Sequence, residues 1–295
     1  MIQTKRTELD YIAEYLPFCK NELLSLPPDL KRVVREIRVR VGQPIFLETD
    51  KGRVALNSVC APEFTEELLK LFTRYSVHSY EKQLAEGLLT LVGGHRVGIC
   101  GTAVVQHGVV TAMRDITSYN IRVAREIVGA ADTLYDRYFP DNTANFTNLI
   151  ILGKPLSGKT TVLRDLARII SKTYKCTIID ERGEIAAKSD NRIRFDLGAN
   201  TDVLDLFPKG AGILTAIRGL SPDFVLCDEI TAQQDELRLC ANSGVSLIMT
   251  AHAATVAEYR RNIAAARFAE WGMPVNAVLL GTGKDIGKIK EYGSL

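Results

Sequence analysis

An eight-residue stretch, Gly153–Thr160, constrains the fold more than any other part of the chain. Its sequence GKPLSGKT fits the P-loop pattern G-x-x-x-x-G-K-[ST] without a mismatch. The glycines let the backbone wrap closely around a phosphate, so that successive N–H groups point inward. The following helix presents its positive N-terminal end to the same charge. The motif therefore predicts a buried strand, a phosphate-binding loop and a helix, in that order.

The residues of this loop have distinct expected roles in binding ATP. Lys159 is expected to reach the β- and γ-phosphates, and the Thr160 hydroxyl is expected to bind Mg²⁺. Thr161 lies one step further into the helix and is a candidate to contact the α-phosphate. The residues predicted to bind the nucleotide are Gly153, Lys154, Pro155, Leu156, Ser157, Gly158, Lys159, Thr160 and Thr161.

The chain around the loop alternates apolar strands with helical patterns. Strands are predicted over 146–152, 176–180, 224–228 and 245–250, and helices over 159–171, 210–220 and 232–242. The strands are apolar throughout instead of alternating, which is typical of a parallel sheet covered by helices on both faces. In such sheets, ligands bind beyond the carboxyl ends of the strands. The predicted fold of this region is an α/β P-loop domain with a mostly parallel sheet.

Two acids, Asp228 and Glu229, end one of the apolar strands. Adjacent carboxylates at the end of a buried strand are costly unless a cation or an arginine compensates them. Asp228 is therefore predicted to hold Mg²⁺, directly or through water. Glu229 is predicted to polarise the attacking water as a general base.

A second acidic cluster, Asp180–Glu184, follows the strand over 176–180 and should face the same edge of the sheet. Glu181 in this cluster is a candidate to position the attacking water or to support Mg²⁺. A solvated loop of salt bridges is the alternative interpretation.

Two further residues are candidates from their positions alone. His252 ends the strand over 245–250 and could sense the γ-phosphate, although a lone histidine is more often structural. Arg218 precedes the strand that ends in Asp228 and could neutralise phosphate charge in its own subunit or a neighbour's, as an arginine finger. An ordinary surface arginine is the alternative.

The region before the P-loop differs in texture from the rest of the chain. Residues 1–140 mix short helices with hairpin-like strands, which predicts a smaller α+β domain, and residues 145–295 form the P-loop domain. The loop-forming segment RYFPDNTAN, near 136–145, is the predicted linker. Strands are expected at 36–41, 88–92, 95–105 and 119–123, and a helix is expected at 62–75.

Composition excludes several classes of protein. The net charge of +2 gives no general basic surface for nucleic acid. A local basic run over 31–40 could bind phosphates, but aromatic residues do not alternate with it as they do in single-strand binders. The six cysteines form no C-x-x-C pair, which argues against a zinc or redox motif. No signal peptide and no apolar run of membrane-spanning length are found, so we expect a cytoplasmic protein.

Four segments together resemble the secretion-ATPase branch of P-loop proteins, the motors of type II and type IV secretion. Members of the branch carry a Walker A motif, an acidic Asp box, a Walker B motif and a His box in this order. The corresponding segments here are GKPLSGKTT, TIIDERGEI, AIRGLSPDFVLCDEI and ANSGVSLIMTAH. Within the branch, the likeness is to the stage III sporulation protein AA family, through EIRVRVGQP (36–44), SVHSYEKQLAEG (76–87), GGHRVGICG (93–101) and NIRVARE (120–126).

This resemblance implies a RecA-like ATPase that uses Mg²⁺ and forms a ring, expected to be a hexamer, with ATP bound between subunits. It also implies a motor in the mother-cell cytoplasm that docks on membrane-embedded channel subunits. Many secretion motors have Gly before the Walker B Glu, where this chain has Asp228. It therefore stays open which of Asp228, Glu229 and Glu181 holds Mg²⁺ and which activates water.

Three functions are compatible with these observations. The first is Mg²⁺-dependent ATP hydrolysis that powers a sporulation-associated, secretion-like channel complex. The second is an ATPase or translocase stimulated by nucleic acid. The third is an ATP-dependent scaffold that does not hydrolyse its nucleotide.

Overall fold

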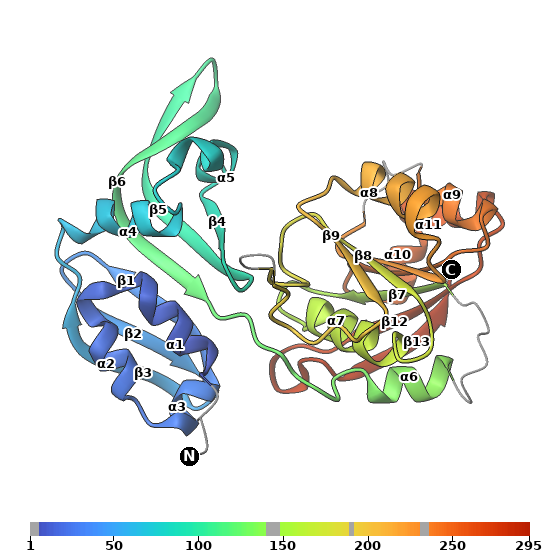
Figure 1. The fold of residues 1–295 in the computed structure, drawn as a ribbon, viewed down its shortest axis with the longest axis horizontal. Coiled ribbons are helices and arrows are strands. Elements are labelled where there is room, and N and C mark those ends of the chain that lie inside the picture. The colour runs from blue at the N-terminus through green and yellow to red at the C-terminus, as the bar shows by residue number, and fades with distance from the viewer. Residues whose placement is uncertain (1–5, 140–147, 189–191, 231–235) are drawn as a thin grey trace. The chain divides into compact units, whose positions relative to one another are not determined.

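The computed structural model describes residues 6–139, 148–188, 192–230 and 236–295. Contacts divide the chain into two units, Met1–Arg125 and Glu126–Leu295 (Figure 1). The linker predicted near 136–145 falls within the second unit, and its residues 140–145 lie outside the described ranges. Helix α6 (Asp132–Tyr138) packs on α7 (Lys159–Ile170), and this contact places the residues before that segment in the second unit.

The first unit is a six-stranded antiparallel sheet in the order β3-β2-β1-β6-β5-β4. Its strands are β1 Val34–Arg40, β2 Pro44–Thr49, β3 Gly52–Val59, β4 Leu88–Leu91, β5 His95–Gln106 and β6 Val109–Arg122. Its α-helices are α1 Glu8–Ile12, α2 Lys20–Ser25, α3 Pro28–Val33, α4 Phe64–Phe72 and α5 Glu81–Ala85. Short 3₁₀ turns occur at Ala13–Tyr15, Pro17–Cys19 and Val77–Tyr80.

Side-chain alternation along the strands gives this sheet one buried face. Ile37 in β1 pairs with Leu47 in β2 and Ile121 in β6, and all three are fully buried in one cluster with side chains of α1, α2 and α4. The predicted alternating strand over 36–41 is confirmed and begins two residues earlier. Strand β6 begins at Val109, ten residues before the predicted start at 119. Most residues in the part of β6 before Tyr119 are exposed, so buried and exposed side chains do not alternate there.

The second unit contains a seven-stranded sheet in the order β13-β12-β7-β11-β10-β8-β9. Its strands are β7 Asn148–Gly153, β8 Cys176–Asp180, β9 Thr201–Asp205, β10 Phe224–Cys227, β11 Ser246–His252, β12 Val275–Leu280 and β13 Ile289–Ser294. Each neighbouring pair is parallel except β12 and β13, which are antiparallel. The predicted mostly parallel sheet is therefore confirmed, and β9, β12 and β13 extend it beyond the predicted strands.

Helices cover both faces of this sheet. Leu149 and Ile151 of β7 belong to a buried cluster with α6 and α7, whereas Ile150 and Leu152 belong to a second cluster on the other face. The other helices are α8 Lys209–Thr215, the π-helical turn η5 Ala216–Leu220, α9 Leu237–Asn242, α10 Val256–Arg260 and α11 Ile263–Glu270, with a 3₁₀ turn at Gly283–Asp285. Of the helix predicted over 232–242, residues 232–235 lie outside the described ranges.

The strand order brings the polar strand ends to one edge. Strands β7, β11, β10 and β8 are consecutive in the sheet, and His252 at the end of β11 is level with Gly153 at the end of β7. Asp228 and Glu229 follow the last residue of β10, and Asp180 ends β8. The P-loop, both acidic segments and the histidine therefore share the carboxyl edge of one parallel sheet.

Phe224 tests how much the core beneath this edge contributes to stability. Its buried ring meets Phe139 and Tyr174 edge-on, with centroids 5.7 and 5.4 Å away. We expect Phe224→Ala to lower the free energy of unfolding by about 3–5 kcal/mol, because a cavity replaces these contacts. Urea unfolding followed through Trp271, the single tryptophan of the chain, reports on this unit. Phe207→Ala, at a ring that is 37% exposed, is the control, and an equal loss there would contradict the burial argument.

None of the described helices is long and apolar enough to cross a membrane. Among the described residues of the second unit, the longest helix, α7, has 12 residues, whereas a spanning helix needs about 20.

Candidate active site

The P-loop holds the first turn of α7 open to an anion. Gly158, which precedes the helix, has a φ of +91°, a left-handed value that strains residues with a Cβ. A Cβ at Gly153 would lie 2.3 Å from the Ser157 Oγ. Within the described chain no side chain caps this end of α7, so its first N–H groups are available to a ligand. The predicted strand, loop and helix are confirmed here.

The Lys159 side chain is buried at the mouth of the loop. Its Nζ donates to the carbonyls of Gly153 and Lys154, at 3.1 and 3.2 Å, and to the Nδ1 of His252, at 3.1 Å. Because an ammonium can only donate, His252 accepts at Nδ1 and carries its proton on Nε2. These three acceptors are neutral, and a phosphate could replace them.

A hydroxyl and a carboxylate meet beside the loop. The Thr160 Oγ1 donates to the Asp228 Oδ2 at 2.6 Å, and the Thr250 hydroxyl donates to the other Asp228 oxygen. Mg²⁺ prefers such oxygen ligands and takes its remaining ligands from phosphates and water. The described residues contain no group of three or more His, Cys, Asp or Glu side chains that would hold a metal unaided. This donor set therefore fits a magnesium ion that arrives with a nucleotide.

Glu229 follows Asp228 in the chain and has a constrained backbone conformation. Its φ is +50°, and its N–H donates to Asp228 Oδ1 at 3.1 Å and to Thr250 Oγ1 at 2.9 Å. Its carboxylate contacts His252 Nε2 at 3.2 Å through Oε1 and Arg182 at 2.5 Å through Oε2. A series of contacts thus runs from Lys159 through His252 to Glu229.

The acidic segment after β8 is folded around Asp180. The buried Asp180 carboxylate accepts from the N–H groups of Glu184, Ile185 and Ala186, each at 2.9 Å. Burial raises the pKa of Asp180 above its ordinary value, and the three hydrogen bonds oppose that rise. Asp180 therefore shapes the loop and is not positioned to take part in chemistry.

Glu181 extends from the same loop to a buried lysine. Its Oε2 lies 2.9 Å from the Nζ of Lys209, which also donates to the backbone carbonyl of Glu229 at 2.9 Å. Burial raises the pKa of Glu181, but the hydrogen bond and charge of Lys209 outweigh it and hold the value below the ordinary one. Lys209 thus joins the loop after β8 to the strand end that carries Glu229. These groups line an open hollow of about 230 Å³.

The family model "Sporulation stage III, protein AA" matches residues 12–293. The chain belongs to this family. Stage III sporulation protein AA of Bacillus subtilis is 35% identical over 259 residues, which cover 85% of this chain and 83% of that protein. The uncharacterized protein ycf45 of Porphyra purpurea is 29% identical over 46% of this chain and 24% of its own length.

Solved structures show the fold of this protein AA family member to be RecA-like. The Legionella pneumophila ATPase DotB superposes with a TM-score of 0.58 and 16% identity, over 99% of this chain and 80% of that one. The pilus retraction motor PilT with bound ADP superposes with a TM-score of 0.52 and 17% identity, over 98% of this chain and 82% of that one.

In this member of the protein AA family, Arg164 connects the phosphate helix to the acidic loop. Its guanidinium donates to the carbonyls of Glu184 and Ile185, each at 2.7 Å, and lies 4.0 Å from the ring centroid of Phe195. Burial lowers the pKa of Arg164 to about 10, which still leaves the side chain charged at neutral pH. The helix that carries Lys159 and the loop that carries Glu181 are therefore joined by one side chain.

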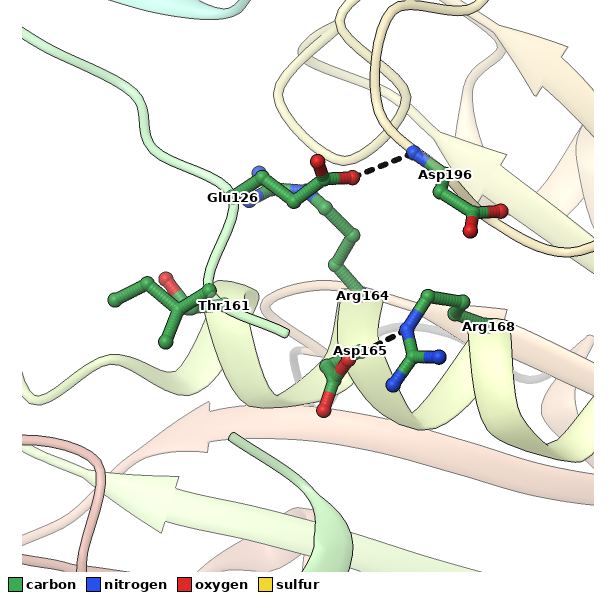
Figure 2. Close-up of a pocket in the computed structure, with 7 residues that line it drawn as sticks. Glu126, Thr161, Arg164, Asp165, Arg168 and Asp196 are labelled. Atoms are coloured by element: carbon green, nitrogen blue, oxygen red, sulfur yellow. Dashed lines mark hydrogen bonds and ion pairs between the residues drawn. The ribbon is translucent and has the colours of Figure 1, made fainter. Parts of the chain in front are cut away.

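The shallow hollow in Figure 2 lies on the same helix, beyond Thr161. Asp165 accepts from the N–H of Ala131 at 2.9 Å and from Arg168 Nε at 2.8 Å. Glu126 accepts from the N–H of Asp196 at 2.6 Å. The segment that begins the second unit is thus hydrogen-bonded to α7 through Ala131 and to the residue Asp196 through Glu126.

The structure brings together most, but not all, of the residues that the sequence nominates. Lys159, Thr160, Glu181, Asp228, Glu229 and His252 lie at the carboxyl edge of the sheet, and Lys154, Pro155 and Leu156 are the exposed part of the loop. Arg218 is exposed on η5, before the amino end of β10, so it does not join them within one chain.

Four residues of the site were not nominated from the sequence. They are Arg164, Arg182, Lys209 and Thr250, whose side chains contact the P-loop helix, the acidic loop or the Walker B acids. A signal existed for two of them, because Arg182 lies inside the acidic cluster and Thr250 lies two residues before His252.

Proposed function

We infer that the chain binds Mg²⁺ and ATP at Gly153–Thr161 and hydrolyses the nucleotide to ADP and phosphate. The observation that carries this inference is the 2.6 Å contact between Thr160 and Asp228. It joins the first turn of the phosphate helix to the acidic end of β10. The contacts of Lys159 with His252, and of His252 with Glu229, add the phosphate-binding and proton-accepting groups to the same edge.

Each residue then has a defined part in the reaction. Lys159 exchanges its carbonyl and imidazole partners for the β- and γ-phosphates. The oxygen of a water molecule forms a bond to the γ-phosphorus while the bond from that phosphorus to the bridging oxygen of ADP breaks. The proton of the water passes to the Glu229 carboxylate. Thr160 and Asp228 would hold Mg²⁺, which supplies positive charge to the phosphate oxygens.

This assignment chooses among the three acids that the sequence left open. Asp228 lies against Thr160 and is the proposed metal ligand. Glu229 has its carboxylate directed away from that pair, toward His252 and Arg182, and is the proposed base. Glu181 is engaged by Lys209, so we assign it to holding the loop in place.

The proposed physiological role is that of a motor. Membership of the sporulation stage III protein AA family, together with a fold shared with the ATPase DotB and the pilus motor PilT, supports a ring-forming ATPase that drives a membrane channel complex. We propose a homo-oligomer, taken as a hexamer, that acts from the mother-cell cytoplasm through membrane-embedded partner subunits.

The basic run over 31–40 gives little support to a nucleic-acid-stimulated enzyme, because its charges are mostly neutralised. Lys31 pairs with Asp10 at 2.6 Å, and Arg35 pairs with Asp50. Arg38 pairs with Glu36 at 2.7 Å. Cations engaged in this way are poor ligands for a phosphate backbone. Nucleic-acid binding depends on cations that can neutralise the phosphates and so release their counterions.

The test of this proposal is the rate of phosphate release from ATP against protein concentration. We expect hydrolysis that falls at least about tenfold when excess EDTA removes Mg²⁺, because the metal neutralises the developing charge. The rate per chain should rise with concentration if chains assemble around shared sites. Addition of DNA or RNA should leave it unchanged. A rate that depends on nucleic acid would favour the translocase, and the absence of hydrolysis at every concentration would reject the proposal.

A further inference from the structure

The described site holds a guanidinium that the ATPase reaction can use. Hydrolysis of a γ-phosphate spreads negative charge over three oxygens, and cations beyond the P-loop lysine commonly stabilise it. Arg218 is separated from Glu229 by the length of β10, about 13 Å at 3.3 Å per residue. Within the same chain that arginine therefore lies at the opposite edge of the sheet.

Two cations do lie beside Glu229, and their surroundings differ. Lys209 is 6% exposed and is committed to Glu181 and to the Glu229 carbonyl, both at 2.9 Å. The Arg182 side chain is 51% exposed, and its one ion pair is with Glu229 at 2.5 Å. A guanidinium has five N–H donors, and among the described residues no second hydrogen bond or ion pair of Arg182 is found, although its charge also acts on Glu181. Lys209 is thus a fixed structural cation, whereas Arg182 can move to a new anion.

The backbone of the loop fixes the position of Arg182, although about half of its side chain is exposed. Its loop is closed by the three N–H groups that Asp180 accepts and by the two carbonyls that Arg164 binds. Gly183, the next residue, has a φ of +67° and allows the sharp turn. The loop therefore presents Arg182 at the hollow beside Asp228 and Glu229 (about 230 Å³).

Two cations connect to the Glu229 carboxylate, one of them through His252. Lys159 reaches Glu229 through His252, and Arg182 reaches the same carboxylate from the other side. A phosphate held by Lys159 and attacked by a water on Glu229 would lie beside that carboxylate. It would therefore be within reach of a side chain that already extends to it.

We propose that Arg182 is a catalytic residue that stabilises the transferred phosphoryl group within its own chain. This rests on the ATP hydrolysis proposed above. In the structure Arg182 and His252 each contact one oxygen of Glu229, so these contacts compete with a water for the base. The γ-phosphate carries more negative charge than one carboxylate and draws Arg182 away. Nucleotide binding thus frees the base and supplies the stabilising cation in one exchange of partners.

The first test compares Arg182→Gln with Arg218→Gln, two exposed arginines changed in the same way. We expect Arg182→Gln to lower kcat about 1,000-fold, at the lower end of the range for arginines that stabilise the transferred phosphoryl group, with ATP affinity changed less than about threefold. Affinity for ADP with aluminium fluoride, a mimic of the transferred phosphoryl group, should fall in parallel with kcat, while ADP affinity stays unchanged. If Arg182 had only a structural role, the substitution would change the affinities for ADP with aluminium fluoride and for ADP alike. Unaltered kcat in Arg182→Gln would overturn the proposal.

The second test distinguishes action within a chain from action across chains. Arg182→Gln chains are mixed with Lys159→Ala chains, which lack a functional P-loop but keep Arg182. If Arg182 serves its own site, the mixture is no more active than the Arg182→Gln chain alone. Recovery of activity would show that the arginine acts in a neighbouring site and would overturn the proposal as stated. Inactive wild-type protein would instead reject the ATPase assignment, so the two failures are distinguishable.

Discussion

Replacing Lys159 with alanine should abolish ATP binding, with an affinity loss of at least about 100-fold, equivalent to about 2.7 kcal/mol. The wild-type ammonium gives up three neutral acceptors when the phosphates arrive. Hydrogen bonds between a charged and a neutral group contribute about 1.5–3 kcal/mol, but a buried charge left without its partner costs about 3–5 kcal/mol. The contact between Lys159 and the phosphates therefore contributes more free energy than the three hydrogen bonds that Lys159 gives up. Removing the side chain should for this reason weaken ATP binding.

Titration with a fluorescent ATP analogue measures this affinity directly. Lys172→Ala is the matched control, because this exposed lysine follows the far end of the same helix. Its affinity should stay within about twofold of wild type, since exposed charges contribute little. Unchanged nucleotide affinity in Lys159→Ala would reject the assignment of the P-loop as the phosphate site.

Glu229→Gln should separate binding from chemistry. The substitution keeps the size and shape of the side chain but removes the group that accepts the proton of water. We expect kcat to fall about 1,000-fold, in the range for general-base catalysis, while ATP affinity stays within about threefold of wild type. Rapid-quench measurement of a single turnover reports the chemical step without product release.

Glu181→Gln provides the comparison, because its carboxylate is engaged by Lys209 at 2.9 Å. We expect it to lower the rate by about tenfold or less, through a looser loop. A greater loss in Glu181→Gln than in Glu229→Gln would exchange the two assignments. If Glu229→Gln hydrolysed ATP normally, the base would have to be another group. A scaffold that only binds ATP would show no difference between any of these proteins in turnover.

Local patterns predicted the central part of the second unit well. The strands 176–180 and 224–228, the P-loop and the helix from Lys159 are specified by apolar runs and by one motif, and the structure has them within one or two residues. Strands β9 and β13 lie at the two edges of the sheet, where burial is partial, and their mixed polar sequences gave no continuous apolar signal.

The missing site residues could not be read from spacing, because their roles depend on contacts between separate segments. Lys209 reaches Glu229 only because α8 begins beside the ends of β8 and β10. Arg218 shows that proximity in sequence does not mean proximity within the fold of one chain. It precedes Asp228 by ten positions, but the whole of β10 lies between them, so nearness along the chain meant distance in the fold.

The hydrogen bond from Ala131 N–H to Asp165 makes the phosphate helix also an anchor for the start of the second unit. Lys159 and Thr160 occupy the first turn of α7, and Asp165 follows at about 9 Å along the axis, at 1.5 Å per residue. Over so short a length a helix behaves as a rigid rod. Any shift of this helix when a phosphate binds or leaves would therefore also displace Ala131. Ala131 lies only five residues after Glu126, the first residue of the second unit. One short helix and one hydrogen bond therefore connect the P-loop to the segment that begins the second unit.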